Sequence, residues 1–431
     1  MIRELFKHSQ KSKFARNAFT LTIGTSIAQF LPMLFYPILG RIYSPEEFGL
    51  LATLISITSI LAVLASAKYE DSILIARTNN DAANIISLVI LLSLSFLLIS
   101  AILLQLVGKK MELWLNEPNL NKWLFICSLS AFSIIVFRCY NEWCVRNQYF
   151  KSLSWNKIVN SAAITLGKLF FGFVNLFSAG LVVGDLLGRI ISAGSCFIRG
   201  YKQDKSEFYD LSLYKMQLLA KQFKKFPIYI LPAELLSTIG GSLPVFMIGA
   251  YFNSAEVGYY AMTMNLLSIP ISVISRALRD VFRQRANEEY IKTGKCVILY
   301  LKLFRILLIS STIGSLIIVF VLPTIFIIVL GGQWRSAGEY SQILLPMMAI
   351  DFISISLSGI LLVTQKMKIE FFWQLYYFGI TITSLLVGAL VFQDIRACLI
   401  SFSIGRSTAY LLYIYLSYKY SKGDLKNAKK S

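Results

Sequence analysis

The chain has 431 residues, of which 56% are hydrophobic and only 15% are charged, and its mean hydropathy is +0.63. Soluble domains contain about 45–50% apolar and about 25% charged residues, so this composition excludes an ordinary soluble protein and indicates a membrane protein. The 42 Lys and Arg against 23 Asp and Glu give a net charge of +19. In a membrane protein that excess is typical of cytoplasmic loops, so we expect no nucleic-acid partner.

The chain has few side chains in the arrangements that metal binding and redox chemistry require. The six cysteines show no C-x-x-C pairing, and the single histidine, His8, has no ligand-like neighbours. The sequence therefore predicts neither a disulfide framework nor a metal site nor histidine-based catalysis, and we expect no cofactor.

Twelve apolar stretches are each long enough to span a bilayer, which takes about 20 helical residues. The first follows a basic segment, residues 1–16, and ends without a small-residue cleavage pattern, so we interpret it as a retained span rather than a signal peptide. The expected spans are 17–40, 48–67, 83–107, 122–145, 154–175, 177–199, 226–251, 257–278, 302–330, 339–363, 370–392 and 396–417.

The Lys and Arg residues are distributed unequally between the two sides of these spans. With the N-terminus inside, the cytoplasmic segments hold 32 of the 42 basic residues and the external segments hold six. This bias predicts that both termini are cytoplasmic. The external connections are short, the longest being roughly residues 108–121, which leaves no room for an external catalytic domain.

The largest break in the apolar pattern falls between the sixth and seventh spans. Together with the twelve predicted spans, this break predicts an all-α integral membrane protein with two parallel six-helix lobes around a central cavity. The expected parts are an N-terminal lobe (1–199), a basic cytoplasmic linker (200–225), a C-terminal lobe (226–417) and a basic cytoplasmic tail (418–431).

A short internal repeat supports the two halves. Gly40–Ala52 aligns with Gly249–Ala261 at an offset of 209 residues, with four identities in thirteen positions. Each copy is predicted to be the external hairpin between the first two spans of its half. Because both copies lie on the same side, the halves would be parallel repeats related by an axis along the membrane normal.

Two segments resemble a known family. Pro37–Gly49, read as PILGRIYSPEEFG, and Lys68–Ile73, read as KYEDSI, resemble the opening of bacterial O-antigen or capsular polysaccharide repeat-unit flippases of the Wzx type. These belong to the multidrug/oligosaccharidyl-lipid/polysaccharide exporter superfamily. The number of spans, the two lobes and the basic central loop extend the resemblance over essentially the whole chain.

The resemblance implies a transporter of the bacterial cytoplasmic (inner) membrane rather than an enzyme. Its implied activity is translocation of undecaprenyl-diphosphate-linked oligosaccharide from the cytoplasmic to the outer leaflet by alternating access. The implied partners are this lipid-linked oligosaccharide, membrane lipids, a polysaccharide polymerase and a chain-length regulator. Coupling to an ion gradient or to the membrane potential is left open.

Eight Asp, Glu, Lys and Arg side chains fall inside the predicted spans and away from their ends, where an unpaired charge costs about 2.5–3.5 kcal/mol on insertion scales. Arg138 and Glu142 are four residues apart, as are Asp185 and Arg189, so each pair shares a helix face, and Lys168 is expected at the depth of Asp185. The charges either hold helices together or line an aqueous cavity. The eight are Arg138, Glu142, Lys168, Asp185, Arg189, Glu234, Asp351 and Arg406.

A diphosphate needs several cationic donors, because guanidinium groups bind phosphate oxygens bidentately and an ammonium adds a compact charge. Candidate ligands for the diphosphate and sugar are Arg138, Lys168, Arg189 and Arg406, with Arg276 and Arg279 at the inner mouth. Those last two are equally consistent with topology and lipid attraction alone. Candidate cavity carboxylates, for ion pairing or coupling, are Glu142, Asp185, Glu234 and Asp351. Candidate polar and aromatic side chains for sugar binding are Tyr140, Asn141, Trp143, Asn156 and Asn160. These five are equally consistent with packing.

Proline and glycine interrupt the first span of each half. Such interruptions at corresponding places point to bending elements of alternating access, although proline is common in membrane helices generally. The candidate hinge residues are Pro32, Pro37, Pro232, Gly240, Gly241 and Pro244.

Two other functions are alternatives to the flippase hypothesis. A cation-coupled multidrug or metabolite antiporter would have the same architecture but would need an acidic site, whereas the spans hold four cations and four carboxylates away from their ends. A membrane glycosyltransferase or polysaccharide polymerase would need a longer external loop with catalytic side chains.

Overall fold

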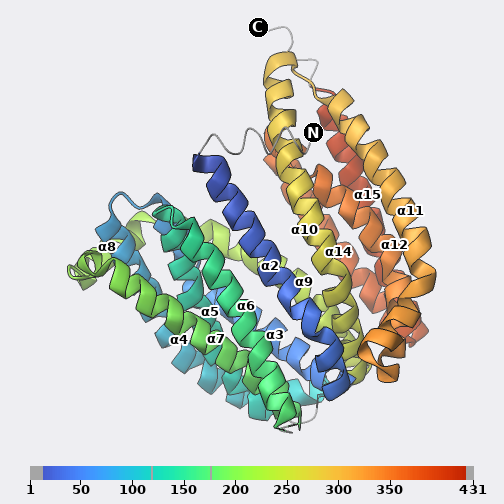
Figure 1. The fold of residues 1–431 in the computed structure, drawn as a ribbon, viewed down its shortest axis with the longest axis horizontal. Helices are drawn as coiled ribbons and strands as arrows, with labels where there is room; N and C mark the ends of the chain where they lie inside the picture. Colours follow the sequence, from blue (N-terminus) through green and yellow to red (C-terminus); the bar gives the residue numbers. More distant parts are fainter. Residues whose placement is uncertain (1–12, 118–119, 175–176, 424–431) are drawn as a thin grey trace. The chain divides into compact units, whose positions relative to one another are not determined.

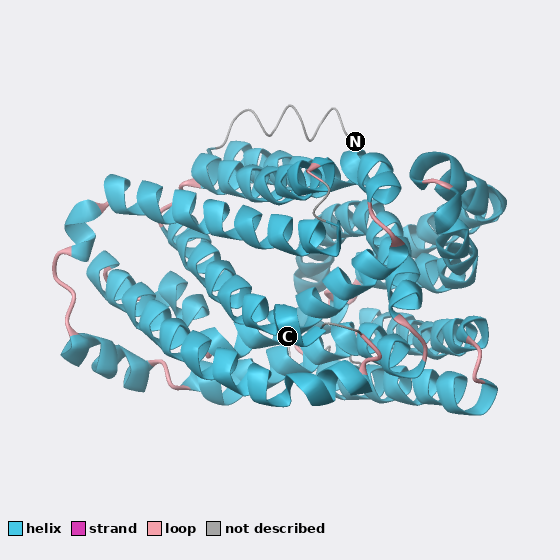
Figure 2. Cartoon of the chain, turned by 90° about the horizontal axis from the view of Figure 1, so that it is seen from below, coloured by secondary structure: helices cyan, strands magenta, loops and turns pink. Residues whose placement is uncertain are grey.

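The computed structural model describes residues 13–117, 120–174 and 177–423. These residues form helices joined by short connections, with no β-strand among them (Figure 2). The all-α prediction is confirmed. Most of the two basic terminal segments, residues 1–12 and 424–431, lies outside the described residues.

The chain divides into two compact units, Met1–Val257 and Gly258–Ser431, and the boundary falls inside α10. Figure 1 shows the helices of each unit in chain order, from blue to red. The first unit contains α2 (Lys13–Ile42), α3 (Pro45–Ser66), η1 (Tyr69–Ile75), α4 (Asn79–Trp114), α5 (Leu120–Arg146), α6 (Phe150–Phe173), α7 (Phe177–Gln203), η2 (Lys205–Phe208), α8 (Leu213–Gln222), η3 (Phe226–Ile230) and α9 (Leu231–Tyr251).

The second unit begins within the long helix α10 and ends with α15. Its elements are α10 (Ser254–Thr293), α11 (Val297–Leu330), η4 (Gly332–Trp334), α12 (Arg335–Leu357), α13 (Ile360–Val363), α14 (Met367–Val387), η5 (Gly388–Phe392) and α15 (Ile395–Ser421). Within it, α12 packs on both α11 and α15, and α14 packs on α15.

Every predicted span coincides with one helix or with two consecutive helical segments. Eleven of the described helical stretches are long and apolar enough to cross a membrane. The twelfth, α6, is helical over the fifth predicted span but is less apolar, because it carries Lys157, Lys168 and several polar residues. Two helices overshoot their spans: α4 continues to Trp114, so much of the predicted external loop is helical, and α10 continues to Thr293.

Small residues set the crossing of α6 and α7, the most extensively packed helix pair of the first unit. A Cβ added to Gly184 would lie 2.5 Å from the backbone nitrogen of Lys168, and one added to Gly188 would lie 2.4 Å from the Cα of Ile164. Glycines one turn apart let two membrane helices approach closely. This approach places Lys168 directly beside α7.

The repeated hairpins begin their second helices in the same way. Ser44 caps α3, with its Oγ accepting from the Glu47 N–H at 3.4 Å while the Glu47 carboxylate accepts from the Ser44 N–H at 2.7 Å. At the equivalent position, 209 residues later, Asn253 Oδ1 accepts from the Glu256 N–H at 3.0 Å at the start of α10. The short sequence repeat is therefore matched by a repeated helix cap.

Candidate functional site

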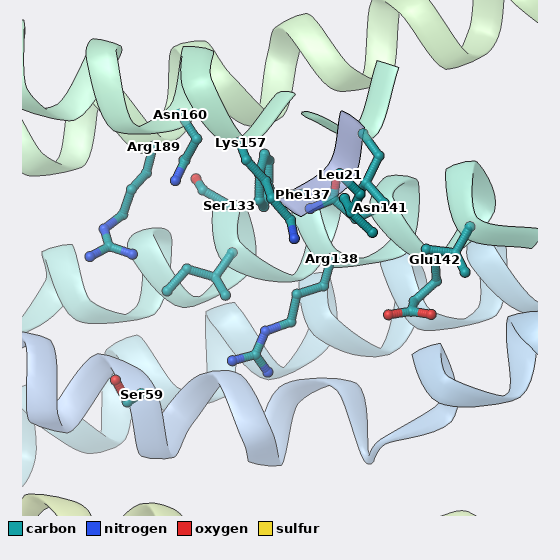
Figure 3. Close-up of a pocket in the computed structure, with 13 residues that line it drawn as sticks. Leu21, Ser59, Ser133, Phe137, Arg138, Asn141, Glu142, Lys157, Asn160 and Arg189 are labelled. Atoms are coloured by element: carbon teal, nitrogen blue, oxygen red, sulfur yellow. The ribbon is translucent and has the colours of Figure 1, made fainter. Parts of the chain in front are cut away.

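A cavity of about 490 Å³ lies in the first unit, between α2, α3, α5, α6 and α7 (Figure 3). Three cations from three helices line it, namely Arg138 on α5, Lys157 on α6 and Arg189 on α7. Among its described lining residues the one carboxylate is Glu142, and the remaining polar side chains are Ser59, Ser133, Asn141 and Asn160. A cavity with this lining favours an anionic ligand that carries hydroxyl groups.

Asp185 joins two of the predicted cations. Its Oδ1 lies 2.9 Å from Lys168 Nζ and its Oδ2 lies 2.5 Å from Arg189 Nε. All three side chains are largely buried, with 15%, 8% and 18% exposure for Lys168, Asp185 and Arg189. One carboxylate therefore balances two cations, and the cluster keeps one net positive charge beside the cavity.

Arg138 pairs with a carboxylate outside its own helix. Its Nη1 lies 3.9 Å from Glu70 Oε1, and no ion pair joins it to Glu142 among the described residues. The cause is the turn after α3, where Ala67 and Lys68 adopt φ angles of 46° and 61° and direct η1 against α5. The expected pair within α5 is thus replaced by a pair between elements.

Glu70 is a member of this site that the spans alone did not identify. Its side chain is only 2% exposed, with Lys68 Nζ at 3.6 Å, while Lys68 also contacts Asp71 at 3.3 Å. Burial raises the pKa of the Glu70 carboxyl above its ordinary value, and the Lys68 charge opposes that rise. Glu70 thus links the cavity cation Arg138 to the end of α3.

Lys157 is the second residue that the sequence analysis did not identify, because it lies close to the predicted cytoplasmic start of its span at residue 154 and was counted with the basic residues of the loop before it. Its Nζ donates to Thr25 Oγ1 at 3.1 Å, from α6 to α2. A signal existed: Lys157 and Lys168 are 11 residues apart, close to three helical turns, and therefore lie on one face of α6.

The polar and aromatic candidates for sugar binding separate onto two faces of α5 and its neighbours. Asn141 and Asn160 line the charged cavity, and the buried Asn141 Oδ1 has no hydrogen-bond partner among the described residues. Tyr140 and Trp143 instead line a separate apolar cavity. Asn156 is buried against Cys144 and lines neither cavity.

Arg406 lies in the second unit, on α15. It is 7% exposed and stacks between two rings, with its guanidinium carbon 4.7 Å from the Tyr377 centroid and 4.8 Å from the Phe402 centroid. Its Nε lies 3.5 Å from Thr381 Oγ1, and it interacts electrostatically with Asp351 on α12. The aromatic contacts leave this guanidinium less accessible than the cations of the first-unit cavity.

The remaining charged candidates are not among the described residues that line the charged cavity. Arg276 is exposed and donates to Ser272, and Arg279 contacts the neighbouring Asp280 at 3.6 Å. Glu234 is half-buried in the first turn of α9. Within the described ranges, no group of three or more His, Cys, Asp or Glu is placed to hold a metal ion.

The candidate hinge residues occupy helical positions. Pro32 and Pro37 lie inside α2 and Pro244 lies inside α9. Pro232 stands in the first turn of α9, directly after the π-helical turn η3. A wide turn before a proline accommodates the missing N–H, so this end of α9 departs from regular helix. Gly240 is buried, and Gly241 faces open space.

Solved membrane transporters share this fold. An inward-facing multidrug resistance MATE family transporter of the MOP superfamily has a TM-score of 0.73 at 13% identity, covering 95% of this chain and 99% of that one. The lipid II flippase MurJ, in an inward closed conformation, has a TM-score of 0.73 at 14% identity, covering 92% and 87%. A MOP superfamily transporter from Pyrococcus furiosus follows at 0.62 and 16% identity, covering 96% of each chain. The protein is thus a multi-pass membrane protein with a MOP transporter fold.

Sequence comparison defines the family within that class. The model of the polysaccharide biosynthesis protein family matches residues 14–282. The chain belongs to this family, which confirms the resemblance carried by Pro37–Gly49.

The succinoglycan biosynthesis transport protein ExoT of Rhizobium meliloti (strain 1021) is 23% identical over 254 residues, covering 57% of this chain and 48% of that protein. The chain therefore spans about half the length of this curated relative. By their names, these relatives are transporters and flippases rather than enzymes.

Proposed function

We propose that the protein is a flippase that moves undecaprenyl-diphosphate-linked oligosaccharide repeat units from the cytoplasmic to the outer leaflet by alternating access. The units would serve the assembly of O-antigen, capsule or a related surface polysaccharide. The protein would lie in the bacterial inner membrane with both termini in the cytoplasm. Membership of the polysaccharide biosynthesis family and the flippase-like fold support this proposal.

The observation that carries the proposal is the charge of the first-unit cavity. Arg138, Lys157 and Arg189 converge from three helices, and the lining offers one carboxylate against them. A diphosphate presents several acceptor oxygens and more than one negative charge, which guanidinium and ammonium donors match in number and geometry. The amides of Asn141 and Asn160 supply neutral hydrogen bonds for sugar hydroxyls.

The ion pairs at the cavity edge provide a means of binding and release. Lys168 and Arg189 share Asp185, and Arg138 contacts Glu70 at 3.9 Å. A bound diphosphate would compete with these carboxylates for the same donors, so the cations exchange one anion for another rather than losing a partner. When Arg189 and Arg138 bind the diphosphate, Asp185 would keep Lys168 and Glu70 would keep Lys68, so neither buried carboxylate is left without a cation.

The same proposal covers the movement of the two lobes, the place of the prenyl tail, the partners and the driving force. The 1–199 and 226–417 lobes would move against each other, with the proline-containing helices α2 and α9 as bending elements. The prenyl tail would remain in the bilayer while the head group crosses. A polymerase and a chain-length regulator would receive the product, and the driving force would be an ion gradient or the membrane potential.

A deletion and complementation experiment in the native bacterium tests the function. Without the gene, we expect surface polysaccharide to disappear while completed lipid-linked repeat units accumulate on the inner leaflet. Complementation with Arg138→Ala, Lys157→Ala or Arg189→Ala is in each case expected to restore little export, because each variant removes one cation from the cavity lining. Full export by all three variants would remove the diphosphate assignment.

The rival proposal, a cation-coupled multidrug or metabolite antiporter, draws on the MATE family neighbour. The cationic lining of the first-unit cavity argues against it, because a cationic drug is best matched by carboxylates. Unchanged surface polysaccharide together with altered drug or metabolite tolerance in the deletion strain would favour the antiporter.

A further inference from the structure

A second cavity, of about 200 Å³, lies on the opposite face of α5 from the charged one. It is formed by α4, α5, α7 and η2, and none of its described lining residues is charged. Its volume is below the roughly 300–1,000 Å³ of sites that enclose a whole drug-sized ligand, so it suits a single hydrocarbon chain. Prominent lining residues are Ile90, Tyr140, Trp143, Phe197, Tyr201 and Phe208.

Fixed side chains build the walls of this cavity. Trp143 Nε1 and the Tyr149 hydroxyl both donate to Asp204, at 2.8 and 3.1 Å, which ties the end of α7 to α5. This places Phe208 of η2 with its ring 5.5 Å from that of Trp143. A Cβ on Gly200 would lie 2.4 Å from the Tyr140 ring, so glycine is required where α7 closes on α5. The cavity is therefore preformed.

The mouth of the cavity combines exposed aromatic rings with the cation Lys205. Phe197 and Tyr201 are 54% and 45% exposed and stack at 6.4 Å on the outer face of α7. In a membrane protein such a face meets lipid. Lys205 Nζ lies 5.9 Å above the Tyr201 ring and 5.5 Å above the Tyr209 ring. The aromatic rings and Lys205 therefore lie where the hydrocarbon chain of a bound lipid would end and its phosphate would begin.

We propose that this cavity binds one acyl chain of an anionic phospholipid, with the lipid phosphate at Lys205. The occupant is a phospholipid rather than the tail of the transported lipid for two reasons. The body of α5 separates this cavity from the charged one, since Tyr140 and Trp143 face here while Arg138 and Asn141 face there. The ammonium of Lys205 also matches the single charge of a phosphodiester, whereas a diphosphate needs several donors.

The forces that would select this lipid are those that remain when the surrounding solvent is the bilayer and not water. Lipid tails are as apolar as the cavity wall, so transfer of a chain from the bilayer brings little hydrophobic gain. Occupancy is favoured instead by the contacts that fill a void against rigid aromatic walls and by the attraction between Lys205 and an anionic head group. Both the chain and the charge should therefore matter.

Native mass spectrometry of the purified full chain, titrated with phosphatidylglycerol or phosphatidylcholine, tests the proposal. We expect the wild type to retain one tightly bound phosphatidylglycerol. Lys205→Ala should reduce the preference for phosphatidylglycerol over phosphatidylcholine by about fivefold, the weight of one cation near an anionic lipid. Ile90→Trp, which fills the cavity, should abolish the tight binding of both lipids.

Two matched variants control for general effects on the surface. Lys151→Ala removes an exposed cation from α6, and Leu98→Trp adds the same bulk to an exposed position of α4; both should bind lipid as the wild type does. Equal binding of the two phospholipids by the wild type, unchanged binding by Ile90→Trp, or a prenyl lipid as the retained species would each overturn the proposal. The Lys205→Ala result decides independently of whether Ile90→Trp folds.

Discussion

Lys168 Nζ and Asp185 Oδ1 meet at 2.9 Å across the crossing of α6 and α7. The contact depends on how closely the two backbones approach, and Gly184 sets that approach. The same carboxylate holds Arg189, which lines the charged cavity. The position of a cavity cation thus depends on a glycine in the packing between two helices.

Gly184→Ala is expected to destabilise the protein, because the new Cβ would lie 2.5 Å from the backbone nitrogen of Lys168. Overpacking of this kind costs about 1–3 kcal/mol. Gly194→Ala is the matched control on the same helix, where a Cβ meets nothing within 4 Å and alanine is the better helix former. Thermal unfolding in detergent should show a lower midpoint for Gly184→Ala only; equal midpoints would refute the account of the crossing.

Lys157→Ala is expected to impair export more than Lys151→Ala. Lys157 lines the charged cavity, whereas Lys151 lies on the same helix with an exposed side chain outside it. Loss of one charge-assisted hydrogen bond to phosphate, worth about 1.5–3 kcal/mol, weakens substrate binding by at least about tenfold. Lipid-linked repeat units should accumulate in cells with Lys157→Ala. Equal accumulation in both variants would contradict a role for this cavity.

Glu70→Gln is expected to flatten the pH dependence of stability. Burial raises the pKa of Glu70 in the folded protein, so the wild type loses stability relative to the variant as pH rises from about 4.5, the ordinary glutamate value, through the raised value. Asp71→Asn, on the same η1 turn but 36% exposed, is the matched control. Melting curves between acid and neutral pH measure the difference, and identical pH profiles of wild type and Glu70→Gln would argue against a buried carboxylate here.

Glu117 offers a second pH test at the predicted external side. It is 6% exposed in the connection after α4, and burial raises its pKa to about 7, opposed by a hydrogen bond from Ser254 and assisted by the charge of Glu46. Relative to Glu117→Gln, the wild type should lose up to about 3 kcal/mol as pH rises from about 4.5 through 7.

The control for that measurement is Glu288→Gln, which changes an exposed carboxylate of α10. It should follow the wild type at every pH. A Glu117→Gln midpoint that stays parallel to that of the wild type from pH 4.5 to 8 would show that Glu117 titrates normally.

The helical spans follow from the sequence because their length and apolar content suffice to predict them. Apolar content says less about where a helix stops, and α10 continues to Thr293 because its charged residues are still good helix formers. Spacing also predicted the Asp185–Arg189 pair and its meeting with Lys168. It did not predict the Arg138–Glu70 pair, since that contact depends on left-handed backbone at Ala67 and Lys68.

The cavity lining was predicted only in part for a related reason. Lys157 lies close to the predicted start of its span at residue 154, so its charge is counted with those of the preceding loop, although its helix begins at Phe150. Which face of α5 meets a charged cavity and which meets an apolar one depends on the helices packed around it. That arrangement is tertiary and leaves no local pattern.

The most direct test of the central claim is translocation by the purified protein in proteoliposomes, scored with a membrane-impermeant reagent that reacts with the sugar. Two otherwise identical prenyl-linked oligosaccharides would be compared, one with a diphosphate and one with a monophosphate. The cationic cavity predicts that the diphosphate form crosses at least about tenfold faster, the difference expected from one lost charge-assisted hydrogen bond. Equal rates for the two lipids, or no transport above protein-free vesicles, would contradict it.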